Sequence, residues 1–158
     1  MTKIVWSEAM SVGVPPLDSD HRIIIDLIGR LDDHGADLSE AINTLIAYTE
    51  YHFFREERVM AECGYPELEA HRQEHGTLAD DVMALQRRYA DGDDSVTAYA
   101  LQQFLTEWLY HHILLEDMAY KPYAEHCARA HDAAKAFGKF RLEDLHPELV
   151  RDAETECA

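Results

Sequence analysis

The sequence predicts an all-α protein, an antiparallel up-down-up-down four-helix bundle with a C-terminal helical extension. Two observations support this fold class. After the opening VGVPPLD, proline and glycine are sparse, so long segments run without a helix breaker. In four of these segments, apolar residues recur at alternating steps of three and four, which is the spacing of one helix face. Four helices with one apolar stripe each can bury those stripes against one another as a bundle.

Local signals set the expected helix bounds. Asp18 and Ser39 are residue types that cap helix N-termini, so we expect them to begin the first and second helices. Gly64 ends the second helix, and Pro66 lies where a first-turn proline begins the third. The segment DGDDS is a loop before the fourth. The expected helices span approximately residues 18–37, 39–64, 66–91 and 95–120.

The inward stripes are interrupted by residues that bind metals. The inward positions are Leu17, His21, Ile24, Ile28 and Leu31; then Leu45, Thr49, His52, Glu56 and Val59; then Leu68, His71, His75, Leu78, Val82, Leu85 and Tyr89; and finally Leu101, Leu105, Trp108, His112 and Leu115. A single histidine on such a stripe is more often a hydrogen-bonded core residue than a ligand. Here, however, all four stripes carry histidine, and burying so many titratable groups without partners costs several kcal/mol each. A shared metal removes that cost.

The donor types indicate which metal. His52 with Glu56, and His71 with His75, are spaced by four residues and so share a helix face. The histidines alone exceed the needs of one tetrahedral zinc. Imidazole with carboxylate favours iron or manganese, as two six-coordinate ions that share bridging carboxylates.

A second bridging carboxylate is needed, and the segment HHILLED offers two. Regular helix geometry pairs His112 with Glu116, whereas Asp117 lies five residues on, about 140° around the helix. Spacing alone therefore favours Glu116.

Several segments together resemble the hemerythrins, specifically the single-domain bacterial ones. They are VWSEAMSVGVPPLDSDH, HFFREE, GYPELEAHRQEH and WLYHHILLED, which cover roughly residues 5–123 in the family's order and spacing. The resemblance implies a non-haem di-iron centre that binds O2 reversibly, in a protein that carries, stores or senses O2 and is not an enzyme.

The resemblance also implies a ligand set. One iron would take His71, His75 and His112; the other would take His21 and His52 and keep one position open for O2; Glu56, Asp117 and an oxo or hydroxo group would bridge them. The family pattern thus favours Asp117 over Glu116, which implies a local widening of the helix, such as a π-bulge, after His112. The family spacing WLxxH selects His112, so His111 should point to solvent.

The O2 pocket and the rival functions follow from the same resemblance. Phe53, Trp108, Leu109 and Ile113 would line the pocket, although plain core packing is an equally simple role for them. The alternatives are a di-iron enzyme acting on O2, peroxide or nitric oxide, or an iron-handling or signalling module. Di-iron oxidases use two Glu-x-x-His motifs, and the sequence has only Glu143–His146, in the tail. Five neutral imidazoles favour holding O2 over cleaving it.

Charge and cysteine content limit the partners and the compartment. The net charge is −17, with 31 acidic and 14 basic residues, which repels nucleic acid and anionic membranes and argues against both. Three widely spaced cysteines without a CxxC motif (Cys63, Cys127 and Cys157) indicate reduced thiols. The N-terminus lacks the apolar run of a signal peptide. We therefore expect a cytoplasmic protein.

The expected division of the chain is a bundle over residues 1–123 and an extension over 124–158. AEHCARAHDAAKAFGKF predicts one more helix, ending at Gly138. The extension could dock a protein partner or mediate dimerisation. His126, Cys127 and His131 could form a second metal site, but the favoured interpretation is that they are exposed residues of a solvated helix.

Overall fold

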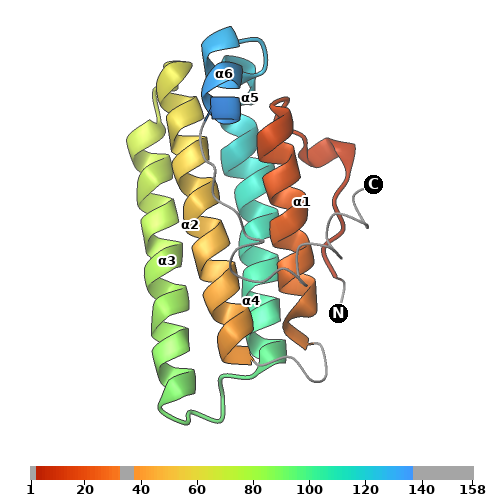
Figure 1. Ribbon diagram of the computed structural model, residues 1–158, viewed down its shortest axis with the longest axis vertical. Helices are drawn as coiled ribbons and strands as arrows, with labels where there is room; N and C mark the ends of the chain where they lie inside the picture. Colours follow the sequence, from red (N-terminus) through yellow and green to blue (C-terminus); the bar gives the residue numbers. More distant parts are fainter. Residues whose placement is uncertain (1–2, 33–37, 137–158) are drawn as a thin grey trace.

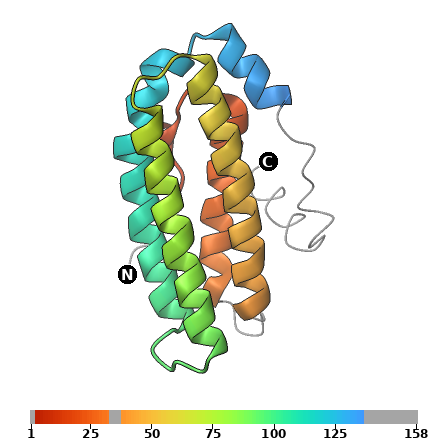
Figure 2. The same ribbon diagram turned by 90° about the vertical axis from the view of Figure 1, so that its left-hand side faces the viewer.

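The computed structural model describes residues 3–32 and 38–136, and over these residues it is helical with no strand. Four long helices run alternately up and down (Figure 1). They are α1 (Pro15–Gly29), α2 (Leu38–Glu62), α3 (Leu68–Ala90) and α4 (Ala98–His111), the last continued by a π-helical segment (His112–Asp117) and α5 (Met118–Ala124). Short 3-10 turns occupy Glu8–Met10 and Arg30–Asp32, and α6 (Ala128–Ala136) lies at one end of the bundle (Figure 2).

The first helix begins earlier than the sequence predicts. Pro15 occupies its first turn, where the fixed φ and the missing N–H of proline are tolerated, and Val14 is the N-cap. The prediction that Asp18 is the cap is wrong. Asp18 lies inside α1, and its carboxylate accepts hydrogen bonds from the backbone N–H of Val12 (2.9 Å) and the hydroxyl of Ser11 (2.6 Å). Asp18 thus holds the preceding loop against α1 through these hydrogen bonds.

The other helix ends agree more closely. Gly64 has φ +70° two residues after Glu62, the last residue of α2, which confirms it as the glycine that stops this helix. The prediction that Pro66 begins the third helix is wrong, because Pro66 lies in the turn and α3 begins two residues later, at Leu68. The helix α2 begins one residue before the expected cap, Ser39. Thr97 caps α4, since its hydroxyl accepts a hydrogen bond from the backbone N–H three residues on (3.0 Å). None of the described helices is long and apolar enough to cross a membrane.

Apolar residues pack in two clusters. The larger fills the space between the four long helices, and the smaller lies where the N-terminal loop, α2, α5 and α6 meet. In the smaller cluster, Ala130 and Ala134 of α6 are fully buried. The expected single helix to Gly138 is interrupted, because the chain turns at 125–127 before α6 begins. Gly138, the expected end of this helix, lies outside the described residues, as do Glu143, His146 and Cys157.

Candidate metal centre

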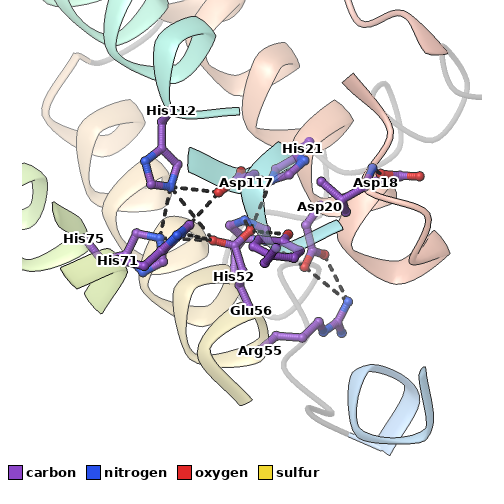
Figure 3. A network of polar contacts seen from close by, with 12 residues as sticks. Asp18, Asp20, His21, His52, Arg55, Glu56, His71, His75, His112 and Asp117 are labelled. Atoms are coloured by element: carbon purple, nitrogen blue, oxygen red, sulfur yellow. Dashed lines mark hydrogen bonds and ion pairs between the residues drawn. The ribbon is translucent and has the colours of Figure 1, made fainter. Parts of the chain in front are cut away.

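The predicted ligand residues lie together in the bundle interior (Figure 3). Each of these residues is buried, with at most 4% of its surface exposed. They form two groups that share Glu56, and within each group the ligand atoms lie within 4.8 Å of one another. The larger group is Glu56, His71, His75, His112 and Asp117, and the smaller is His21, His52 and Glu56. The helices α1, α2 and α3, together with the π-helical segment that continues α4, therefore contribute to one buried polar cluster.

The π-helical segment explains which residues of HHILLED face inward. It spans His112–Asp117, which confirms the expected widening. The prediction that Leu115 lies on the inward stripe is wrong, because the extra residue in the π turn rotates it outward, and it is 64% exposed. The same rotation fully buries Asp117. His111 is exposed, as expected, and Glu116 is only half-buried.

The two carboxylate oxygens of Glu56 face different histidines. Oε1 lies 2.9 Å from Nε2 of His71 and 3.1 Å from Nε2 of His75. Oε2 lies 3.2 Å from Nε2 of His52 and 3.5 Å from Nε2 of His21. One carboxylate thus presents one oxygen to each histidine group, which is the arrangement of a bridging ligand.

Asp117 repeats this division from the opposite side. Its Oδ1 lies 3.0 Å from Nε2 of His112 and 3.2 Å from Nε2 of His71, whereas Oδ2 lies 3.1 Å from Nε2 of His21. The π turn is what brings this carboxylate between the two groups, since residue 116 at regular spacing lies outside the cluster.

The positions of the donor atoms are explained better by bound metal ions than by hydrogen bonds between the side chains. Both carboxylate oxygens of Asp117 and Nε2 of His21 are buried without a well-directed hydrogen bond, although they lie about 3 Å from partners. Nε2 of His75 and Nε2 of His112 face each other at 3.1 Å. Octahedral bonds of about 2.1 Å place adjacent ligand atoms about 3 Å apart. The spacing therefore suits atoms directed at a common ion.

The carboxylates also perturb the histidines electrostatically. Burial alone lowers the pKa of an imidazole, but close polar contacts with Asp117 and Glu56 and the negative charge of both carboxylates outweigh it and raise the pKa of His21 and His71 to about 10. The pKa of His112 rises to about 9 for the same reasons. Burial raises the pKa of Asp117, yet the neighbouring histidines hold it well below its usual range. Protons and cations therefore compete for this site.

Sequence reasoning missed the residue that orients His52. Asp20 is 2% exposed, and its Oδ2 lies 3.0 Å from Nδ1 of His52 (Figure 3). The other oxygen accepts hydrogen bonds from the hydroxyl of Tyr48 (2.8 Å) and the guanidinium of Arg55 (3.1 Å). With Nδ1 so engaged, Nε2 of His52 faces the cluster. A signal existed, because Asp20 stands four residues before the buried Ile24 and so shares its inward face.

Tyr120 is a second residue that the sequence did not reveal. Its side chain is fully buried in α5, and its hydroxyl donates a hydrogen bond to Oε2 of Glu56 (3.0 Å). It follows the π turn, which changes the helix register, so no periodicity could place it beside a residue 64 positions away.

Two aromatic rings each stack on one of the histidines. Phe53 stacks on His75, with ring centroids 3.7 Å apart and planes 5° from parallel. Trp108 stacks on His112 at 4.3 Å and 15°. These contacts restrict the orientation of each imidazole and remove water from one of its faces.

A small cavity of about 40 Å³ adjoins the cluster between the four helices. Its walls are mainly aliphatic and aromatic, and His21, His52 and His112 border it. Of the predicted pocket residues, Phe53, Trp108 and Leu109 line this cavity. Ile113 does not line it; its fully buried side chain packs elsewhere in the larger apolar cluster.

Comparison with known proteins agrees with this geometry. The family model described as "Hemerythrin HHE cation binding domain" matches residues 12–124. The bacteriohemerythrin of Stenotrophomonas maltophilia is 30% identical over 148 residues, covering 88% of this chain and 95% of that protein. The bacteriohemerythrin of Ralstonia nicotianae is 35% identical, covering 74% and 85%. A crystal structure of wild-type hemerythrin superposes with a TM-score of 0.72 at 28% identity, covering 78% and 99%. The chain belongs to the hemerythrin family.

Proposed function

We propose that this protein binds O2 reversibly at a di-iron centre, as a carrier, store or sensor, and is not an enzyme. The observation that carries the proposal is the position of the apolar cavity. It borders both histidines of the group with fewer protein donors, His21 and His52, but only His112 of the other group. It would therefore adjoin mainly the ion that has room for an external ligand.

The proposed ligand assignment follows the contacts. The hemerythrin family binds a di-iron centre, and the cluster of histidines and carboxylates can hold metal ions. His71, His75 and His112 would hold one iron, His21 and His52 the other, and Glu56 and Asp117 would span both. With both carboxylates shared, the second iron would have one protein donor fewer than the first. When bound there, the iron pair would supply the electrons that O2 takes up on binding and gives back on release.

The protein's own contribution is a shaped, dry site. A cavity of about 40 Å³ exceeds the roughly 10–15 Å³ that one water-sized molecule needs, so a diatomic ligand fits. A buried water requires two to four polar partners, and the aliphatic walls offer few. Water is therefore a weak competitor for the position that O2 would occupy.

The donor set favours binding over turnover. Histidines outnumber carboxylates in the cluster, and a neutral imidazole adds no negative charge to stabilise strongly oxidised iron. The hydrogen bond from Tyr120 to Glu56 and the contact between Asp20 and His52 hold these donors in place. Such a site suits a ligand that arrives and leaves unchanged.

The test is repeated oxygenation. Protein loaded anaerobically with ferrous iron should bind two irons per chain, develop a visible absorption band in air and lose it under argon over several cycles. Fewer than two irons per chain would contradict the di-iron proposal. Steady O2 consumption with an electron donor, in place of a stable oxygenated form, would support an enzyme instead.

We further propose that residues 1–123 form the O2-binding bundle and that 124–158 are an extension of it. The family match ends at residue 124, and the first helix of the extension, α6, packs on α2 and contributes none of the candidate ligands. Deleting the extension should then leave O2 affinity unchanged.

A further inference from the structure

An open groove lies on the surface between α2 and α3, directly outside the cavity. Its volume is about 600 Å³, and the two helices that form it run side by side in both views of the bundle (Figures 1 and 2). The iron-ligand candidate His75 lies in its lining, together with Phe53. The groove therefore brings the surface of the protein within one side chain of the metal cluster.

Groove and cavity share part of their walls. Glu50, Phe53 and Ala79 line both. Of these, only Phe53 is buried, at 7% exposure, and its ring stacks on His75. The ring of Phe53 is thus the largest apolar group that stands between the two spaces.

Gly76 lines the groove and brings no side chain into it. It is exposed in the middle of α3, where a glycine costs about 1 kcal/mol relative to alanine. No steric contact requires a glycine here, because a Cβ at this position would meet no atom within 4 Å. Its backbone is helical, so the turn does not require it either. What the glycine provides is empty space in the groove beside His75.

We propose that the α2–α3 groove is the route by which O2 reaches the cavity, with the Phe53 ring as its gate. This inference rests on the proposed O2-binding function. The groove already gives the ring an open side, so a rotation of one side chain joins the two spaces without separating the helices. O2 is small and neutral, so it can pass an aromatic ring without polar partners.

A route can be distinguished from a binding site by kinetics. Gly76 lines the groove but not the cavity. A bulky residue there obstructs passage without touching bound ligand, so it raises the barrier for arrival and for departure equally. The association and dissociation rate constants should fall by the same factor, and their ratio, the affinity, should not change.

The experiment compares Gly76→Leu with Ala84→Leu. Ala84 is on the same helix but lines a separate groove between α3 and α4, so it controls for added bulk on α3. O2 association and dissociation are followed by flash photolysis and stopped flow. Gly76→Leu should slow both about tenfold at unchanged affinity, and Ala84→Leu should slow neither. Wild-type rates in Gly76→Leu would overturn the proposal.

A second measurement does not depend on iron chemistry. Xenon exchange between solvent and the cavity, measured by 129Xe NMR, should be slower in Gly76→Leu and faster in Phe53→Ala than in the wild-type protein. If the protein failed to bind O2, this exchange would still test the route. Exchange unaffected by either substitution would refute the gate.

Discussion

Replacing Asp20 with asparagine should weaken the binding of the iron that we propose His52 holds, and should leave the binding of the other iron unchanged. Asp20 accepts hydrogen bonds from His52 Nδ1 through one oxygen, and from Tyr48 and Arg55 through the other. An asparagine has nearly the same shape but only one acceptor oxygen. If that oxygen still accepts hydrogen bonds from Tyr48 and Arg55, the NH2 group of the asparagine faces Nδ1 of His52. The imidazole N–H then no longer has an acceptor.

The magnitude follows from the strength of the hydrogen bond between Asp20 and His52. A buried hydrogen bond to a charged group contributes about 1.5–3 kcal/mol. Because about 1.4 kcal/mol corresponds to a factor of ten, the affinity of that site for iron should fall about 10- to 100-fold. Removal of a residue that orients a metal-binding histidine typically has the same effect.

The assay is stepwise iron removal by a chelator. In Asp20→Asn, one iron per chain should leave at about 10- to 100-fold lower chelator concentration, and the second should leave as in the wild-type protein. Asp26→Asn is the matched control, since Asp26 lies on the same helix and pairs with Arg30 (2.7 Å) outside the cluster. Equal loss of both irons, or of neither, in Asp20→Asn would refute the assignment of His52 to a separate iron.

Three further predictions follow from the site and the extension. Asp117→Ala should reduce iron content below two per chain and Glu116→Ala should not; the opposite result would restore the regular-helix choice. In metal-free protein, His21 and His71 have a pKa of about 10 against 6.5 when unfolded, so their protonated contacts stabilise the fold below pH 6.5 and are lost as the pH rises through about 10. Metal uptake at pH 7 should therefore release protons to an indicator dye and tighten with rising pH; uptake without proton release would contradict this. Deleting residues 126–158 removes the buried alanines of α6 and should lower Tm by roughly 5 °C or more in calorimetry, and an unchanged Tm would show that α6 adds no stability.

The bundle could be predicted from the sequence because burial repeats with the period of a helix. The buried His21, His52, His71, His75 and His112 all fall on the inward stripes that this period defines. A stripe records which side of a helix is buried, and the four stripes together leave little choice about which residues meet in the centre.

The features that could not be predicted depend on local departures from regular helix geometry or on contacts between residues far apart in the sequence. A π turn shifts the register after His112, so regular spacing favoured Glu116 and placed Leu115 inside; only the family resemblance indicated Asp117. Asp18 has the chemistry of a cap but binds the preceding loop, because Pro15 already begins the helix. Such choices are decided by backbone geometry that residue types alone do not encode.

The contacts around the candidate ligands also could not be predicted from helical periodicity. Asp20 meets His52 across 32 residues, and Tyr120 meets Glu56 across 64. Each pairing depends on which rotamers face one another once the helices are packed. A buried acid on an apolar face could have suggested the first, and nothing in the spacing suggested the second.

The most direct test of the account is to measure iron content and the optical spectrum on the same sample through repeated cycles of air and argon. The account predicts two irons per chain and an absorption band that appears with O2 and disappears without it, at constant iron content. One iron per chain, or a band that appears once and never reverses, would contradict reversible O2 binding at a di-iron centre.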